Sequence, residues 1–189
     1  MKKIGIYGGT FDPIHHGHLI MAREAVETLE LDSVIFVPAA TSPHKLDRHA
    51  ASAALRLEML RAAIESEPKF SSNDCELQRG PPSFAIDTVE EVMRREAGAK
   101  MFYFIGEDNV PTLRTWHRFA ELEKLAEFVV LDRSGLEAEH AFKIIQRKID
   151  ISATEIRNRV ASGRSIRYLV PDAVDRIIQR EQLYRKPTI

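Results

Sequence analysis

One short segment near the start of the chain constrains the fold more than any other. Residues 8–18 read GGTFDPIHHGH, and they follow the apolar run Ile4–Tyr7. Beyond the segment, apolar residues recur at the intervals of an amphipathic helix, at Leu19, Ala22, Val26 and Leu29. This order predicts a strand, a glycine turn and a helix whose first turn carries histidines. A strand that leads directly into a helix is typical of a βα unit in a parallel sheet.

The glycine turn and its histidines together suit a phosphate group. Gly8 and Gly9 free backbone amides, and a helix N-terminus adds the positive end of the macrodipole. His15 and His18 are three residues apart, so their cationisable side chains share one side of the first helical turn. Such donors would stabilise an anionic transition state, and losing one typically costs on the order of 10²–10³ in rate.

The histidine pair has two other interpretations. Histidines three apart can bind zinc, but no Cys lies nearby, no HExxH pattern occurs and no third ligand is evident. They can also be ordinary structural histidines. The glycine spacing is not that of the dinucleotide fingerprint, and the absence of Gly-Lys-Ser or Gly-Lys-Thr excludes a Walker loop. We therefore expect a phosphate site, and no metal held by side chains alone.

Composition narrows the function classes. The 189 residues are 44% hydrophobic and 29% charged with a formal net charge of −1, as in an ordinary soluble domain. Without a net field, nucleic-acid and membrane partners are not expected. Cys75 is the only cysteine, which excludes an internal disulfide and fits a reducing compartment. No signal peptide or membrane-length apolar run is visible, so we expect a cytoplasmic protein.

The rest of the chain alternates strands and helices. Strands are expected at 33–37, 101–105 and 128–131, with a short edge strand within 70–77, and helices at 51–64, after a Ser83 cap, at 119–125, 153–161 and 171–182. Residues 136–150 fit either type. The alternation predicts one α/β domain over residues 1–189, a parallel sheet flanked by helices with a small helical portion at about 152–189. Ligands bind beyond the carboxyl ends of such strands, where Gly106 and Gly135 lie.

A second anion site is indicated at residues 151–157, which read ISATEIR. Ser152 is a good N-cap, and Glu155 completes a capping-box pattern. Thr154 and Arg157 are three apart, so a hydroxyl, a guanidinium and free amides share one face. Alone, the segment fits a capped surface helix with a solvated arginine. Together with the histidine turn it favours a phosphate site, and we expect both segments to fold around one triphosphate.

Both segments resemble the two signatures of the nucleotidyltransferases. The first is GGTFDP followed by HxGH at residues 15–18, and the second is IsxTxxR at residues 151–157. Over essentially its whole length, the chain is similar to the nicotinate-nucleotide adenylyltransferases of the bacterial type. The supporting pieces are Pro43-His44-Lys45, Pro82-Ser83, Ile86-Asp87-Thr88, Phe104-Ile105-Gly106 with Asp108, Trp116 and Leu183-Tyr184.

The resemblance implies a Rossmann-like fold and an adenylyl transfer. ATP and nicotinate mononucleotide would give deamido-NAD and pyrophosphate, by in-line attack of the mononucleotide phosphate on the α-phosphorus. No covalent intermediate is implied, and no general base is needed because the attacking phosphate is already ionised. The implied cofactor is Mg²⁺, bound mainly through the ATP phosphates. The two nucleotides are the implied partners, and a homodimer is left open.

The resemblance also implies roles for individual residues. The implied catalytic residues are His15, His18 and Arg157. The implied ATP-binding residues are Gly8, Gly9, Thr10, Phe11, His18, Gly106, Asp108, Arg133, Ser152, Thr154 and Arg157. The implied mononucleotide-binding residues are Lys45, Ala85, Thr88 and Trp116, with the tryptophan as a stacking platform for the pyridine ring.

Three positions depart from the family pattern and keep alternatives open. Ala85 stands where the family often has Thr, Glu107 where a small residue is commoner, and Ser134 where Pro is usual. Because Ala85 lacks a hydroxyl near the pyridine substituent, nicotinamide mononucleotide is an alternative acceptor. Phosphopantetheine is another, although that branch usually has Thr in place of His15. A nucleotide-binding module without turnover is the alternative from a different class.

Overall fold

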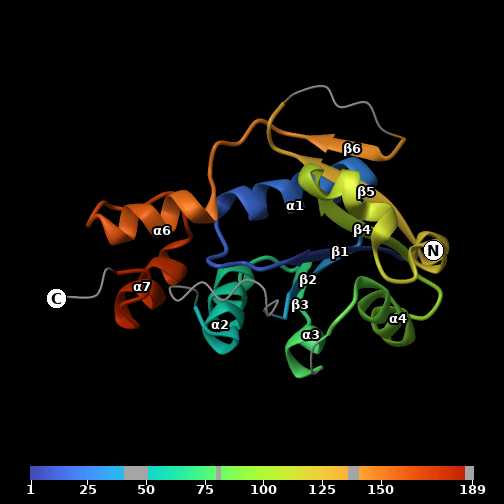
Figure 1. Ribbon diagram of the computed structural model, residues 1–189, viewed down its shortest axis with the longest axis horizontal. Helices are drawn as coiled ribbons and strands as arrows, with labels where there is room; N and C mark the ends of the chain where they lie inside the picture. The colour runs from blue at the N-terminus through green and yellow to red at the C-terminus, as the bar shows by residue number, and fades with distance from the viewer. Residues whose placement is uncertain (41–50, 80–81, 136–140, 186–189) are drawn as a thin grey trace.

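A single parallel sheet organises the protein (Figure 1). The computed structural model describes residues 1–40, 51–79, 82–135 and 141–185. In this part of the chain, six strands pair in the order β3-β2-β1-β4-β5-β6. They are β1 (Lys3–Gly9), β2 (Ser33–Pro38), β3 (Phe70–Ser72), β4 (Lys100–Gly106), β5 (Ala126–Asp132) and β6 (Lys143–Gln146). This is the Rossmann order, and its direction reverses between β1 and β4, where such sheets bind their ligands.

Helices cover both faces of the sheet. They are α1 (His16–Leu29), α2 (Ala53–Ile64), α3 (Cys75–Gln78), α4 (Ala85–Arg95), the 3₁₀ helix η1 (Glu107–Thr115), α5 (Phe119–Leu125), α6 (Ala153–Ala161) and α7 (Asp172–Arg180). Side chains alternate along each strand, so each face has its own core. In β4, Phe102 and Phe104 belong to the core beneath α1 and α2, whereas Tyr103 belongs to the core beneath α4 and α5.

The C-terminal helices join the first signature turn through a shared core. Figure 1 shows α6 and α7 together at the end of the molecule opposite the N-terminus. Ile156 of α6 and Ile178 of α7 are buried in the same cluster as Phe11 and Ile14. The described part of the small helical portion expected at about 152–189 therefore shares one core with the glycine turn. Among the described residues, no helix has the length and apolar character needed to cross a bilayer.

One local expectation is wrong, the helix cap at Ser83. Ser83 is not the N-cap of α4: Phe84 holds that position, and its amide donates to the Asp87 carboxylate at 3.4 Å. The Asp87 carboxylate at the third helical position satisfies the amide of the N-cap residue, as in a capping box, while the Ser83 hydroxyl lies one residue before the cap and accepts from Arg79. The short edge strand expected within 70–77 is confirmed as β3, which ends at Ser72 before α3 begins at Cys75. In the stretch 136–150, which fitted either type, residues 143–146 form the strand β6.

Candidate active site

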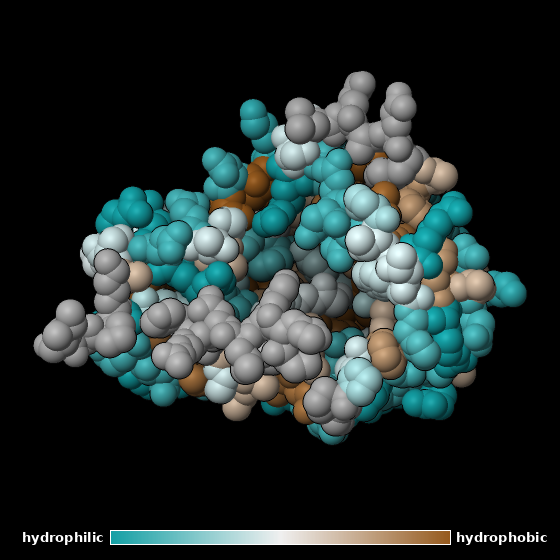
Figure 2. Space-filling view, viewed as in Figure 1, coloured by the Kyte–Doolittle hydropathy of each residue, from teal (hydrophilic) through white to brown (hydrophobic). Residues whose placement is uncertain are grey.

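The first signature lies at the carboxyl end of β1, where the strand order reverses. Gly8 and Gly9 are half-buried there and Thr10 is exposed, so the turn backbone can be reached from solvent. Phe11 differs, because its ring is only 2% exposed and packs edge-on against Tyr7. Any contact of Phe11 with a ligand would use its backbone. The face drawn in Figure 2 is hollowed near its centre, with mainly hydrophilic residues around the hollow.

The two signature histidines form a stacked pair at the start of α1. Their ring centroids are 3.7 Å apart and their planes differ by 28°. His15 is the N-cap residue, and its backbone N–H donates to Nδ1 of His18 at 3.3 Å. An Nδ1 atom that accepts carries no proton, so the neutral His18 ring holds its proton on Nε2. The turn therefore fixes His18 as an Nε2–H donor.

Burial favours the neutral form of both histidines. Burial, together with smaller effects from the charges of Arg133 and His16, lowers the pKa of His15 to about 3. Burial likewise holds the pKa of His18 well below 6.5, with smaller effects from His15 and Arg133. His15 Nδ1 is buried without a hydrogen-bond partner among the described residues, which also disfavours a second ring proton. The pair therefore offers N–H dipoles, and an incoming phosphate would raise both pKa values.

Because Gly17 has no side chain, the His15 ring can lie close to its backbone. A Cβ atom at this position would lie 3.0 Å from both Cε1 and Nδ1 of His15, and 3.4 Å from Cγ2 of Ile149. Contacts that short would force the ring to shift. The glycine of the signature thus sets the position of the first histidine.

The second signature meets the first one directly. Arg157 donates from Nη1 to the backbone oxygen of Asp12 at 2.7 Å, across 145 positions of sequence. Its Nη2 atom lies 3.3 Å from the Thr154 hydroxyl. The Ser152 hydroxyl accepts from the Glu155 amide at 3.1 Å, which confirms it as the N-cap of α6. The two segments expected to share one triphosphate therefore lie side by side.

Arg133 ties the end of β5 to the same place. Its Nη1 atom donates to the carbonyl of Ile151 at 3.0 Å, and its own carbonyl accepts from the Ile149 amide at 3.1 Å. The side chain is exposed, and its charge contributes to the depressed pKa values of His15 and His18. The glycine turn, His15, His18 and the start of α6 form a group of donors that we call the histidine cradle. Arg133 adds a second guanidinium to it, beside that of Arg157.

A buried network beneath the turn was not anticipated from the sequence. Asp12 is 6% exposed, and its Oδ1 atom accepts from the Tyr184 hydroxyl at 2.6 Å and the Ala51 amide at 3.1 Å. Arg56 is 1% exposed and donates to the carbonyl of Thr10 at 2.7 Å. The available signal was an arginine at a helical interval from the buried residues of α2, Met59 and Leu60.

Gly106 and Asp108 lie together at the end of β4. A Cβ atom on Gly106 would be 2.5 Å from Oδ1 of Asp108, so only glycine lets this carboxylate fold back over the strand end. Asp108 is exposed, beside the strand-order reversal. Two departures from the family pattern touch each other nearby, since the Ser134 hydroxyl lies 3.5 Å from Oε2 of Glu107.

A second hollow, which we call the acceptor hollow, opens at the N-terminus of α4. Its volume is about 420 Å³, and it is lined by Glu76, Ser83, Phe84, Ala85, Tyr103, Thr115, Trp116 and His117. Trp116 is half-buried and stands edge-on to Tyr103 at 6.1 Å. The rings of Phe84 and His117 stack at 4.2 Å. Aromatic walls beside a helix N-terminus suit a flat ring that carries a negative charge.

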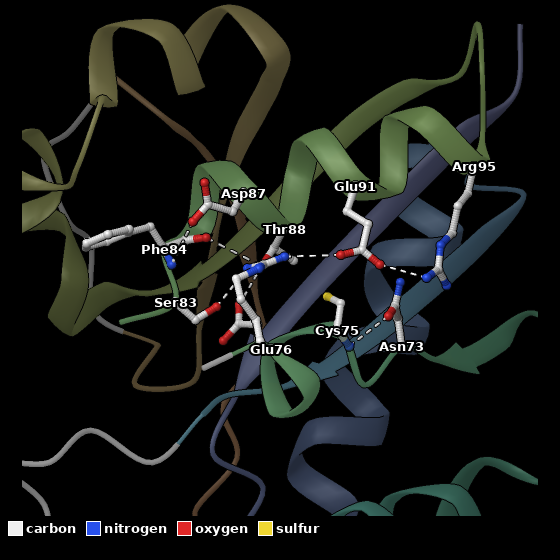
Figure 3. Close-up of polar contacts among 10 residues, drawn as sticks. Asn73, Cys75, Glu76, Ser83, Phe84, Asp87, Thr88, Glu91 and Arg95 are labelled. Carbon is white, nitrogen blue, oxygen red and sulfur yellow. Dashed lines mark hydrogen bonds and ion pairs between the residues drawn. The ribbon is translucent and has the colours of Figure 1, made fainter. Parts of the chain in front are cut away.

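Among the described residues expected near the mononucleotide, Thr88 does not line the acceptor hollow. Thr88 is fully buried, and its hydroxyl donates to Oε1 of Glu76 at 2.8 Å (Figure 3). Glu76 reaches the hollow in its place, and burial raises the pKa of this carboxylate despite the Thr88 hydrogen bond. Lys45 lies outside the described residues. Sequence reasoning missed Glu76 because no local pattern marks which acidic residue faces inward.

Two comparisons of sequence identify the relatives of this chain. The family model described as cytidylyltransferase-like matches residues 6–159. A protein of Exiguobacterium sibiricum named as a probable nicotinate-nucleotide adenylyltransferase is 43% identical over 187 residues, covering 96% of this chain and 98% of its own length. A Bacillus pumilus protein of the same name is 40% identical, covering 97% and 99%.

Solved structures share the fold at lower identity. The nicotinic acid mononucleotide adenylyltransferase of Plasmodium falciparum, complexed with NaAD, superposes with a TM-score of 0.79 at 16% identity, over 97% of this chain and 98% of that one. A nicotinate-nucleotide adenylyltransferase structure from Vibrio parahaemolyticus gives 0.72 at 21% identity, over 98% and 97%. The sequence relatives, together with the paired signatures, show that this chain belongs to the nicotinate-nucleotide adenylyltransferases, within the cytidylyltransferase-like nucleotidyltransferases.

Proposed function

We propose that the histidine cradle and the acceptor hollow together transfer AMP from ATP to nicotinate mononucleotide, giving deamido-NAD and pyrophosphate. The observation that carries this proposal is the contact between Arg157 and the Asp12 carbonyl, which joins the two signature segments. Amide, imidazole and guanidinium donors that are close together suit a triphosphate, and this contact supports such a grouping.

The histidines hold the α-phosphate, where negative charge builds up in the transition state. The Nε2–H of His18 and the amides of Gly8 to Thr10 donate to its oxygens, and stacking against His15 fixes the direction of the His18 donor. Ser152, Thr154 and Arg157 hold the β- and γ-phosphates, which leave as pyrophosphate. Arg133 and Asp108 lie where the adenosine half of ATP would reach beyond β4 and β5.

No residue of the cradle has to remove a proton. The attacking mononucleotide phosphate is already ionised, so the bond from its oxygen to the α-phosphorus forms as the bond to the β-phosphate oxygen breaks. Catalysis then comes from positioning and from charge stabilisation. Neutral histidines suit this task, since donors that are fixed in advance need no reorganisation as the charge develops.

The cradle fits Mg²⁺ that arrives with ATP. Among the described residues, no three His, Cys, Asp or Glu side chains are placed to hold a metal, and Asp12 Oδ1 already accepts from Tyr184 and Ala51. Phosphate oxygens would therefore supply most of the ligands. The ion supplies charge neutralisation on the leaving pyrophosphate.

The acceptor hollow selects the pyridine nucleotide. The ring stacks on Trp116, and its carboxylate lies at the N-terminus of α4, where the amide of Ala85 and the helix dipole favour a negative charge. A neutral carboxamide gains less from that field. We therefore propose nicotinate over nicotinamide as the preferred ring, although Ala85 offers no hydroxyl.

The test is pyrophosphate release from Mg-ATP with nicotinate mononucleotide, nicotinamide mononucleotide and phosphopantetheine in parallel. We expect the fastest release with the first. His18→Ala should lower turnover at least 10²-fold while circular dichroism shows an intact fold. ATP binding without release of pyrophosphate would instead support a binding module, and near-normal turnover of His18→Ala would refute the role of that side chain.

We further propose a cytoplasmic site of action without nucleic-acid or membrane partners. The near-zero net charge and the single buried cysteine, Cys75, support this. Sedimentation in solution tests the homodimer that the sequence leaves open.

A further inference from the structure

The side chain of Arg79, the residue that follows α3, contacts both the segment before α4 that lines the acceptor hollow and α4 itself. Arg79 donates from Nη1 to the Ser83 hydroxyl at 2.8 Å and from Nη2 to Oε2 of Glu91 at 3.1 Å. Figure 3 shows Ser83, Glu91 and Arg95 of this network beside Thr88. The side chains of the Arg79–Glu91 pair are 26% and 19% exposed, so the pair is partly shielded from water.

The two hydrogen bonds of Arg79 connect the segment before α4, at Ser83, with the middle of α4, at Glu91. Ser83 lines the hollow and stands two residues before Ala85, the first residue of α4, while Glu91 lies farther along the same helix. A guanidinium is a rigid planar fork, and it can hold two acceptors at a fixed separation. Arg79 therefore sets the position of Ser83 relative to the body of α4, and with it the direction of the free amides.

We propose that Arg79 is a positioning residue for the acceptor: it fixes the Ser83–Ala85 wall of the hollow and so sets the affinity for the negatively charged ring substituent, without acting on ATP. This inference rests on the proposed function of the hollow. The reason for selectivity is geometric, because both contacts lie on the α3–α4 side, whereas the proposed triphosphate donors come from the turn between β1 and α1 and from the start of α6.

The chain offers a matched control on the same carboxylate. Arg95 donates to the other oxygen of Glu91 at 2.7 Å, but its side chain is 64% exposed and it is one helical turn from Glu91 on α4 itself. Arg95→Met removes an ion pair with Glu91 and leaves the link between Arg79 and Ser83. A general loss of charge near α4 would affect both arginine variants alike, whereas loss of the positioning contact affects only one.

The experiment measures KM for each substrate separately in Arg79→Met, Arg79→Lys and Arg95→Met. We expect Arg79→Met to raise KM for nicotinate mononucleotide about tenfold, the scale of one lost charge-assisted hydrogen bond, with KM for ATP within twofold of wild type. Arg79→Lys, which keeps the charge but not the fork, should recover part of the loss. Arg95→Met should stay within twofold for both substrates.

Equal rises in both KM values, no rise in either, or the same effect from Arg95→Met would overturn the inference. If Arg79→Met does not fold, Ser83→Ala replaces it. An unchanged KM for the mononucleotide in Ser83→Ala then refutes the role of the hydrogen bond between Arg79 and Ser83. Calorimetric binding of nicotinate mononucleotide to wild type and Arg79→Lys separates the two proposals. Absent turnover in the wild type refutes the proposed reaction, while equal affinities in the two proteins refute the role of Arg79.

Discussion

Lowering the pH should destabilise the ligand-free protein through His15, and replacing that histidine should remove this part of the pH dependence. The pKa of His15 is about 3 in the folded protein against an ordinary value of 6.5. Between these values the unfolded chain binds a proton that the folded protein refuses. The free energy of unfolding therefore falls as the pH drops below about 6.5 and levels off near pH 3.

The size of the effect follows from the part of the pH range below the unfolded pKa. When the pH falls from 7.5 to 5.5, about one pH unit of that change lies below the unfolded pKa of 6.5. Over that unit, one histidine lowers the free energy of unfolding by about 1.4 kcal/mol. His18 adds an effect of the same sign, because its pKa is also depressed by burial. A histidine that is equally solvated in the folded and unfolded states has the same pKa in both, so it does not contribute to this pH dependence of the free energy of unfolding.

Urea unfolding at the two pH values measures this difference in wild type, His15→Gln and His117→Gln. The loss of stability on acidification should be about 1.4 kcal/mol smaller in His15→Gln than in wild type. His117, which is exposed beside Phe84, controls for removal of an imidazole outside the cradle. If His15→Gln keeps the full wild-type pH dependence, the histidine pair is not held neutral by burial and the argument for fixed N–H donors fails.

Three further predictions concern Tyr184 and Gly17 near the histidine cradle and Trp116 in the acceptor hollow. Tyr184→Phe should lower the free energy of unfolding by about 1.5–3 kcal/mol, because its hydroxyl donates to the Asp12 carboxylate at 2.6 Å; unchanged urea denaturation would contradict that bond. Gly17→Ala should reduce kcat at least tenfold, by displacing His15, while Tm changes little, since the helix propensity of alanine offsets the crowding; an unchanged kcat would count against the tight fit. Trp116→Ala should raise KM for the mononucleotide and not for ATP, and equal rises would remove the stacking role.

The features that the sequence predicted correctly are the local ones. Strand and helix periodicities lie within single segments, so they predict the parallel sheet and its flanking helices. The Ser152 cap depends on residues three positions apart, and it forms as expected. At α4 the helix begins one residue later than a Ser83 cap requires, and residue types alone did not reveal that Phe84 would be the N-cap, with its amide bound by Asp87.

Long-range polar partners could not be predicted in the same way. Tyr184 and Asp12 are 172 positions apart, and nothing near either residue marks the other as its partner. The inward direction of Glu76 likewise depends on α3 and α4 packing together, which places its carboxylate beside Thr88. Such contacts depend on the three-dimensional arrangement of elements, which periodicity does not specify.

The hydrogen bond between Tyr184 and Asp12 can form only late in the synthesis of the chain. Asp12 leaves the ribosome early, yet the hydroxyl that anchors its carboxylate is made 172 residues later. Until then the carboxylate beneath the glycine turn lacks that donor, and the helix that carries Arg157 is itself translated late. A nascent chain therefore lacks this support of the glycine turn until nearly all of its residues have been made, and products that stop short of position 184 never gain the donor to Asp12.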